Sequence, residues 1–335
     1  MSVSDYLFSI CLPVYNTEQY LHRALDSIAN QAFDPEKIET VVVNDGSPHT
    51  KECDQIIAEY SSRLSIQYIA KNTNEGLFLA RKTAVEKAAG RYILFLDSDD
   101  SLEIHALRIL SENLADEPDY VQFRIYDVMG SEKSLYHSVL EDESHKTIAD
   151  VLQNNVLHNL VNKCYNAYML KQIYEMLPQP YAVYAEDYYQ SVIIEYYSYK
   201  KTFIDIPLYN YFRHIGITSD NTFKNRENLV RIIESSYNIE RNLVLFFEKK
   251  GERQYAQYVK TYIQELYINF AYRVNSFFII IFVIRKLPNE YHGIRLTIFK
   301  KFLLHNMKKL IKNILPHGLV RLIIRRKNKV YISND

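Results

Sequence analysis

Five apolar residues in a row, 92–96, end directly at the carboxylates of Asp97, Asp99 and Asp100. An unbroken apolar run of this length is typical of a strand buried on both faces, as in a mostly parallel sheet. Open sheets of that kind bind ligands beyond the carboxyl ends of their strands. Because alternate residues of an extended chain point the same way, Asp97 and Asp99 can share one cation or one polyphosphate, and their oxygens suit Mg²⁺ or Mn²⁺. The same pattern also fits a solvated acidic turn that binds no ligand and caps a helix that starts near Leu102.

Strand and helix patterns alternate in the segment before this acidic turn. We expect strands at 7–14, 38–43 and 64–69, and helices that begin near Asn16 and cover 54–63 and 77–89. This alternation predicts βαβ units, and hence an α/β fold with a mostly parallel sheet and right-handed crossovers. Beyond the acidic turn we expect a helix at 103–114, a strand at 120–125, an irregular insertion at 128–150 and a strand at 203–212.

Four short motifs follow one another in this region. They are SICLPVYN at 9–16, VNDGS at 43–47, NEG at 74–76 followed by Ala80-Arg81, and DSDD at 97–100. In this order and spacing they resemble the motifs of family 2 glycosyltransferases of the bacterial surface-polysaccharide type. The resemblance implies a GT-A fold, in which an α/β domain holds a sugar nucleotide and a divalent metal. The GT-A catalytic domain would cover residues 1–220, and a helical C-terminal region would cover residues 221–335.

The first two motifs would bind the base of the nucleotide. The resemblance implies that Pro13 and Tyr15 line the base and that Tyr15 stacks on it. Asp45 would accept a hydrogen bond from the base imide, which favours uracil or thymine. Each residue also has a simpler interpretation, because Tyr15 is one of 29 tyrosines and fits a core position, whereas Asp45 fits a turn residue bound to its own backbone.

The next two motifs would bind the rest of the donor. The resemblance implies that Asn74 and Arg81 bind the nucleotide sugar, with Arg81 facing the phosphates. Asp97 would contact the nucleoside, and Asp99 would ligate Mg²⁺ or Mn²⁺. Without the resemblance, Arg81 is equally well interpreted as a solvated helix residue.

A second acidic pair, Glu186 and Asp187, opens an apolar helix after a proline-rich loop. Acids are electrostatically favoured in a first helical turn, which alone would explain the pair. It also resembles the Glu-Asp dyad of the family, in which the Asp is the general base. An inverting transfer needs a carboxylate that takes the proton of the acceptor hydroxyl. We therefore predict that Asp187 is the catalytic base, with Glu186 as its neighbour.

Two basic residues complete the candidate site. The strand at 203–212 leads into Arg213, and the resemblance implies that Arg213 neutralises charge on the leaving group. His214 fits either a further phosphate or metal contact or, as is more common for a single loop histidine, a structural role. Lys163 resembles a family lysine that precedes an acceptor-side helix. Taken alone, Lys163 is better interpreted as a surface lysine.

The C-terminal region differs in charge from the rest of the chain. From residue 291 on, eleven Lys or Arg accompany one acid, Asp335, although the whole chain has 40 residues of each sign. Segments 298–315 and 319–329 combine basic residues with an apolar face, which in the first segment comprises Phe299, Leu303, Met307, Leu310 and Ile314. This composition favours an anionic membrane surface through 298–329, or else a helix that covers the core. Nucleic acid is not favoured, because basic and aromatic residues do not interleave as in a known binding module.

Together these features predict an inverting glycosyltransferase that moves a sugar from a UDP-sugar to a hydroxyl of a surface glycan or lipid-linked glycan. The three cysteines lack C-x-x-C spacing and no signal segment is recognisable, which favours the cytoplasm, at the inner face of the membrane. A sugar-phosphate nucleotidyltransferase would need a glycine-rich basic loop where 12–16 has none. A non-catalytic nucleotide-sugar-binding membrane protein would have degraded acids, and a dehydrogenase would need G-x-G-x-x-G. The sequence makes no prediction of the sugar or the oligomeric state.

Overall fold

The computed structural model describes residues 5–136, 142, 144–153, 156, 158–178, 184–213, 226–273, 277–287, 291, 293 and 295–304. One nine-stranded sheet forms its centre. The strands are β1 Phe8–Val14, β2 Ile38–Asn44, β3 Ile66–Ala70, β4 Tyr92–Phe95, β5 Ser101–Leu102, β6 Tyr120–Met129, β7 Glu132–Leu135, β8 Lys163–Asn166 and β9 Lys201–Phe212.

The sheet is built around a parallel core. Its order is β3-β2-β1-β4-β8-β6-β9-β5, with β7 paired to the edge of β6. Strands β1 to β4 are parallel to one another, β8 runs against β4 and β6, and β6 and β9 are again parallel. Every residue of β1, β2 and β4 is buried, as expected for strands covered on both faces. The predicted α/β class with a mostly parallel sheet is confirmed.

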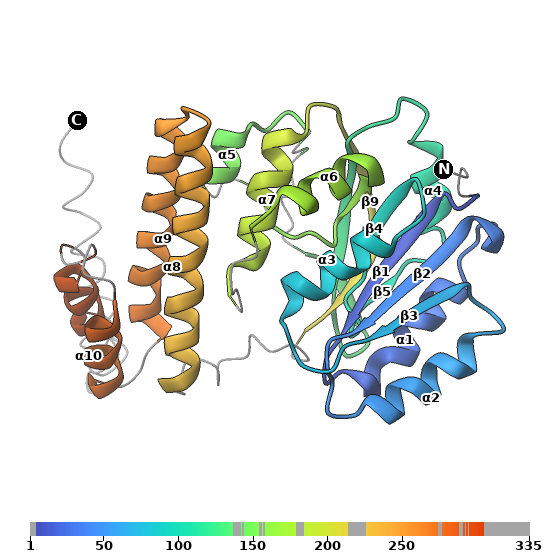
Figure 1. The fold of residues 1–335 in the computed structure, drawn as a ribbon, viewed down its shortest axis with the longest axis horizontal. Helices are drawn as coiled ribbons and strands as arrows, with labels where there is room; N and C mark the ends of the chain where they lie inside the picture. Colours follow the sequence, from blue (N-terminus) through green and yellow to red (C-terminus); the bar gives the residue numbers. More distant parts are fainter. Residues whose placement is uncertain are drawn as a thin grey trace, which may run out of the picture.

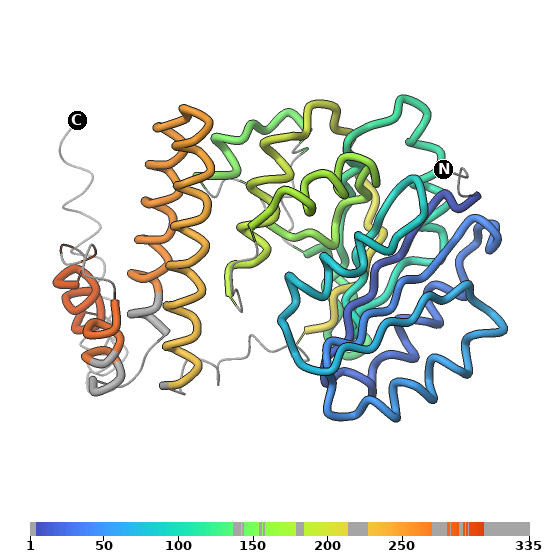
Figure 2. Tube along the Cα trace, viewed as in Figure 1, coloured from blue at the N-terminus to red at the C-terminus, as the bar shows by residue number. Residues whose placement is uncertain are grey.

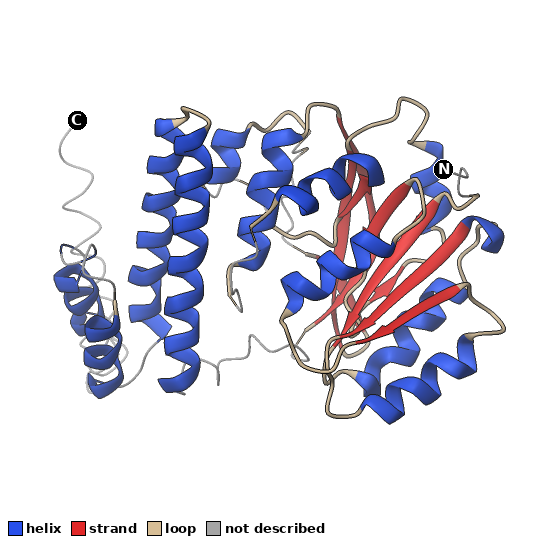
Figure 3. Ribbon diagram, viewed as in Figure 1, coloured by secondary structure: helices blue, strands red, loops and turns tan. Residues whose placement is uncertain are grey.

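Helices cover both faces of the sheet (Figures 1 and 3). They are α1 Glu18–Ala29, α2 Thr50–Tyr60, α3 Leu77–Lys87, α4 Ala106–Glu112, α5 Ile148–Leu152, α6 Ala167–Met176, α7 Glu186–Tyr197, α8 Arg226–Lys249, α9 Arg253–Arg273 and α10 Phe277–Lys286, with a 3-10 turn at Pro35–Lys37. The chain moves outward from β1 to β3 through α1 and α2, and then returns through α3 to β4. Right-handed crossovers therefore place α3 on the opposite face from α1 and α2.

The reversal of strand order lies between β1 and β4, and it positions the site. The parallel ladder between these strands ends with Cys11 opposite Phe95, followed by one hydrogen bond from Leu96 N–H to the Cys11 carbonyl (3.0 Å). Pro13, which has no N–H, comes after the end of this ladder and pairs only with Val43 of β2. Ligands of open α/β sheets bind at such a point, beyond the carboxyl ends of the strands.

Two parts of the fold differ from the sequence prediction. The expected irregular insertion at 128–150 contains the end of β6, its hairpin with β7, and α5, which Thr147 and Asp150 start as a capping box. All four residues of β7 are exposed, so β7 has no apolar alternation by which to detect it. The helix expected at 103–114 is also shorter, because Ser101 and Leu102 pair with β9.

The C-terminal helices pack on the α/β domain through a shared core. Figure 2 shows α8 and α9 side by side next to α7, with α10 beyond them. The main hydrophobic cluster extends from the sheet into Ile239, Leu243 and Phe247 of α8 and Val259 of α9. A division at residue 220 therefore remains a prediction, because the core is continuous across it. No helix among the described residues is long and apolar enough to cross a bilayer.

A second hydrophobic cluster changes the interpretation of the basic segment. It joins the first half of α8 and the second half of α9 to α10, and it includes Ile298 and Phe302. Of the predicted apolar face, Phe299 is half-buried and Leu303 is exposed, whereas Ile298, outside that face, is fully buried. The rest of that predicted face, and the segment 319–329, lie outside the described residues.

Candidate active site

The acidic turn after β4 is tied to the end of β9. Asp100 is buried, and its carboxylate accepts hydrogen bonds from the Tyr209 hydroxyl (2.7 Å) and the Phe212 N–H (2.9 Å). The Tyr209 hydroxyl also accepts the Asp97 N–H (3.2 Å). Burial, and then the charges of Asp97 and Asp99, raise the pKa of Asp100 well above its ordinary value. Asp100 therefore holds the turn in place, and both of its carboxylate oxygens accept hydrogen bonds from protein groups.

Asp99 is the acid of this turn that is available to a cation. Its backbone carbonyl accepts a hydrogen bond from Arg23, but its carboxylate has no ion pair with another described residue. Burial, and then the charge of Asp97, raise the pKa of Asp99 to about 6. No three His, Cys, Asp or Glu side chains form a metal cluster within the described part of the chain. One such carboxylate nevertheless fits Mg²⁺ or Mn²⁺, because these ions commonly take one or two carboxylates together with substrate phosphates.

Arg81 joins the two acidic sites. It projects from α3, is 1% exposed, and donates to Asp97 Oδ1 (3.2 Å) and to Asp187 Oδ1 (2.5 Å). The interpretation of Arg81 as a solvated helix residue is therefore wrong. Asp97 and Asp187 lie 90 positions apart in sequence, yet the structure brings them to one guanidinium. A contact between Arg81 and donor phosphates stays a prediction.

Glu186 and Asp187 begin α7. The residue before them, Ala185, has left-handed backbone angles (φ 60°, ψ 18°), and no side chain caps the helix. Burial, and then the charge of Asp187, raise the pKa of Glu186 to about 7. Glu186 therefore differs from Asp187, whose carboxylate is paired with the Arg81 cation. The two neighbouring acids have different environments, as the assignment of distinct roles requires.

Asp45 is fixed by the loop that carries Asn74. Its carboxylate accepts hydrogen bonds from the N–H groups of Glu75 (3.2 Å) and Gly76 (2.8 Å), and Lys71 Nζ lies 3.2 Å away. The interpretation of Asp45 as a turn residue bound to its own backbone is wrong, because the backbone that it binds belongs to another loop. Asn74 itself is exposed beside it. The structure thus brings the second and third motifs together, and their base and donor contacts stay predictions.

Gly46 allows the two loops to meet. Its φ is +68°, and a Cβ at this position would lie 2.3 Å from the backbone carbonyl carbon of Thr73. Only glycine fits both the left-handed backbone and this close approach. The glycine of the VNDGS motif therefore has a packing role that is independent of any ligand.

Three predicted donor-site residues lie at the same edge of the sheet. Pro13 is buried in β1, and Tyr15, which follows the end of β1, is 38% exposed. The core interpretation of Tyr15 is therefore wrong, and its ring is accessible for stacking. Arg213 follows β9, is exposed, and is held by Asp127 through two bonds of 2.7 Å and 2.5 Å, which raise the pKa of Arg213. Its contact with a leaving group stays a prediction, and His214 lies outside the described residues.

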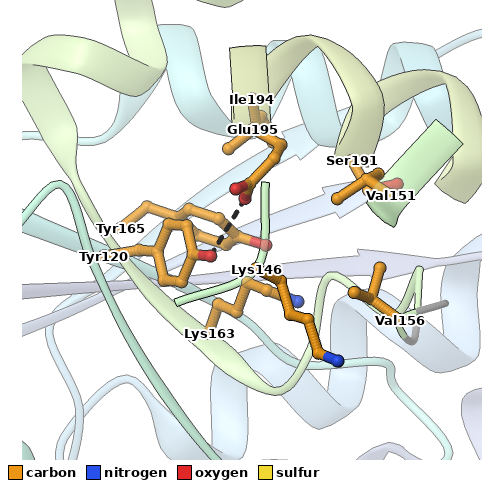
Figure 4. Close-up of a pocket in the computed structure, with 9 residues that line it drawn as sticks. All are labelled: Tyr120, Lys146, Val151, Val156, Lys163, Tyr165, Ser191, Ile194 and Glu195. Carbon is orange, nitrogen blue, oxygen red and sulfur yellow. Dashed lines mark hydrogen bonds between the residues drawn. The ribbon is translucent and has the colours of Figure 1, made fainter. Parts of the chain in front are cut away.

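Lys163 lines a separate cavity near the other end of α7 (Figure 4). It is buried, and its Nζ donates to the Asn159 carbonyl and to Asn162 Oδ1, both at 3.1 Å, so the surface-lysine interpretation is wrong. Across this cavity Glu195 accepts the Tyr120 hydroxyl (3.0 Å) and pairs with Lys201. The cavity of about 20 Å³ has room for one water molecule and none for a sugar nucleotide.

Comparison with known proteins agrees with the motif order. Residues 9–175, about half of the chain, match the model of glycosyl transferase family 2. GlyA, a glycosyltransferase from Streptococcus pneumoniae, is 34% identical over 151 residues, which are 45% of this chain and 21% of that protein. EpsH, a putative glycosyltransferase from Bacillus subtilis, is 26% identical over 62% of this chain and 61% of that protein. The chain belongs to glycosyltransferase family 2.

The fold also agrees with a solved member of this group. The structure of residues 1–349 of Staphylococcus aureus TarS, in complex with UDP-GlcNAc, aligns with a TM-score of 0.54 and 20% identity over 90% of each chain. The predicted GT-A fold and glycosyltransferase class are confirmed, so the nucleotidyltransferase and non-catalytic alternatives are wrong. The glycosyltransferase spans less than two thirds of the length of the curated relatives above.

Three residues that bind the predicted site residues were not identified from the sequence. Tyr209 joins Asp97 to Asp100, Asp127 fixes Arg213, and Lys71 approaches Asp45. None of the three stands in a motif, and one tyrosine among 29 has no distinguishing signal. These contacts form where strand ends and loops meet in the folded chain, so no local sequence pattern marks the residues that make them.

Proposed function

We propose that this glycosyltransferase moves a sugar from a UDP-sugar to a hydroxyl of a surface glycan or lipid-linked glycan, with inversion and with Asp187 as general base. The observation that carries the proposal is the bridge from Arg81 to Asp97 and Asp187. It links the acid predicted to contact the donor with the acid predicted to activate the acceptor. A displacement at one carbon needs both groups within reach of that carbon.

Asp187 is suited to take a proton from an acceptor hydroxyl. Arg81 binds Oδ1, which leaves Oδ2 to accept the proton. As the proton moves to Asp187, the acceptor oxygen forms a bond to the anomeric carbon and the bond from that carbon to the diphosphate breaks. The electron pair of the broken bond leaves with UDP. One displacement of this kind inverts the configuration at the anomeric carbon.

The donor half of the site lies on the other side of Arg81. Tyr15 and the loop fixed by Asp45 are suited to hold the base and the nucleoside, with Asp97 beside them. Asp99 is suited to hold Mg²⁺ or Mn²⁺, which supplies positive charge to the diphosphate when bound. Arg213, fixed by Asp127, is positioned after β9 to add further positive charge.

Relatives support the choice of donor and acceptor. The solved TarS structures contain UDP or UDP-GlcNAc. TarS from Staphylococcus aureus, a poly(ribitol-phosphate) β-N-acetylglucosaminyltransferase, is 36% identical over 30% of this chain. A second relative is a minor teichoic acid biosynthesis protein of Bacillus subtilis, 33% identical over 50% of this chain. These names favour a UDP-sugar donor and a cell-surface polymer as acceptor.

The test separates donor binding from transfer. Asp187→Asn keeps the shape of the side chain but cannot act as a base, so we expect unchanged UDP affinity by calorimetry and turnover reduced by ~10²–10⁴. Asp205→Asn is the control, because Asp205 also pairs with an arginine, Arg124, but on the surface. Near wild-type turnover of Asp187→Asn would remove the base from the proposal. NMR of the product that showed retained anomeric configuration would overturn the single displacement.

We also propose that the C-terminal basic segment holds the enzyme at an anionic membrane surface, on the cytoplasmic side. Leu296, Leu303 and Leu304 are exposed near Lys300, beside the buried Ile298 and Phe302. Each basic group near such a surface contributes about 1 kcal/mol, less at high salt. A chain that ends at Leu304 keeps the buried residues, and it should lose the sedimentation with anionic vesicles that we expect of the whole chain at low salt. Failure of the whole chain to bind those vesicles would contradict the proposal.

A further inference from the structure

One hydroxyl of α8 holds the backbone just before α7. Ser235 is fully buried, and its Oγ accepts a hydrogen bond from the Tyr184 N–H (3.0 Å) and donates one to the Tyr184 carbonyl (2.8 Å). A single side chain therefore satisfies both polar backbone groups of one residue. Ser235 stands 51 positions after Tyr184 and beyond the segment that matches the family model.

The backbone held in this way sets the direction of the first turn of α7. Ala185 follows Tyr184 and has φ 60°, a left-handed conformation that is unfavourable for an L-residue. Such a conformation persists only where its surroundings determine it. Because α7 has no side-chain cap of its own, the clamp from Ser235 is a contact that fixes the backbone at Tyr184, next to Ala185. Glu186 and Asp187 come immediately afterwards.

A second contact from the C-terminal helices holds the other side of the acidic pair. Tyr188 directly follows Asp187, and its ring stacks on Tyr262 of α9 with centroids 3.8 Å apart and planes 17° apart. His158 meets the edge of the same ring at 4.9 Å. The backbone that carries Asp187 is therefore fixed on one side by α8 and on the other by α9, whereas Arg81 fixes only the carboxylate.

We propose that Ser235 is a positioning residue for the reaction, and that α8 and α9 hold the general base in place through it and Tyr262. The proposal rests on the role of Asp187 proposed above. Without the hydroxyl, the Tyr184–Ala185 turn loses the contacts that stabilise its left-handed conformation. A displacement of about 1 Å at a reacting group lowers turnover by roughly 10²-fold. The other predicted donor residues lie on or after β1, β2, β4 and β9, and Arg81 is the predicted donor residue that binds Asp187 directly.

The test compares two neighbouring serines. Ser235→Ala should lower kcat by roughly tenfold to 10²-fold with the KM of the UDP-sugar unchanged. Ser236→Ala is the matched control, since Ser236 is equally buried but bonds only to the Ile232 carbonyl of its own helix (2.9 Å). If Ser235→Ala does not fold, Ser235→Cys takes its place, because a thiol of similar size is a weaker partner, and its kcat should also fall. Equal kcat for the Ser235 variant and Ser236→Ala would overturn the proposal.

A double variant distinguishes the failure of this proposal from the failure of the base assignment. If Ser235 acts through Asp187, adding Ser235→Ala to Asp187→Asn should reduce kcat no further. An additive loss in the double variant would show that Ser235 acts elsewhere. Wild-type turnover of Asp187→Asn alone would instead refute the base assignment, whatever Ser235→Ala does. A Ser235→Ala variant that lost donor affinity in calorimetry would also contradict the proposal.

Discussion

Replacing Arg81 by methionine tests whether one cation holds the two acidic segments together. The side chain is 1% exposed, and Asp97 and Asp187 retain exposures of 32% and 39%. Removing one partner of a buried ion pair costs about 3–5 kcal/mol, and partial exposure of both acids lets water recover some of this, so we expect about 2–3 kcal/mol. The control is Arg108→Met, whose partner Glu112 lies 2.8 Å away on the surface of α4, and which should cost about 0.5 kcal/mol or less.

Urea unfolding at two pH values measures this effect and its cause. Burial raises the pKa of Asp97 and Arg81 lowers it, so without Arg81 that pKa rises further above the ordinary value of 3.8. The ionised form then destabilises the folded variant at pH 7, and protonation relieves this as the pH falls. The difference between wild type and Arg81→Met should therefore be larger at pH 7 than at pH 5. Equal losses for Arg81→Met and Arg108→Met at pH 7 would refute the bridge.

Two further substitutions test other parts of the site. Because the pKa of Glu186 is raised to about 7, wild-type stability should fall as the pH rises from about 4.5 to 7. Glu186→Gln should make this slope shallower, although Asp99 and Asp100 still contribute to it, and parallel curves in urea unfolding would contradict the prediction. Gly46→Ala and Gly130→Ala both place alanine at positive φ, but only at Gly46 does the Cβ meet backbone. Gly46→Ala should thus cost about 1–3 kcal/mol more, and equal melting temperatures would exclude the steric argument.

The parallel half of the fold could be predicted because its signals are local. The apolar runs of β1, β2 and β4 are buried throughout, and the glycine and asparagine turns between them mark their ends. The second half could not be predicted in the same way. Strand β8 has four residues, β7 is wholly exposed and α5 has five residues, so each is too short or too polar for periodicity to detect.

In the candidate site too, the sequence named individual residues, but only the structure shows which of them are in contact. The ordered motifs named Arg81 and Asp97, the second acidic pair named Asp187, and the structure brings the three together. Their arrangement could not be read from the sequence, because a buried arginine between two acids has the same local pattern as a solvated one. The same is true of Tyr15, which the pattern placed equally well in the core.

The position of Asp187 depends on three parts of the chain that sequence motifs treat separately. Residues 9–175 match the family and contain Arg81, which binds the carboxylate, but Asp187 lies after this segment. Ser235 and Tyr262 lie further on, and they fix the backbone on either side of Glu186 and Asp187. Since the contacts from α8 and α9 do not reach the donor residues on β1 and β4, changes in these helices should alter turnover while donor affinity is retained. The C-terminal helices would then belong to the catalytic unit, although no motif marks them.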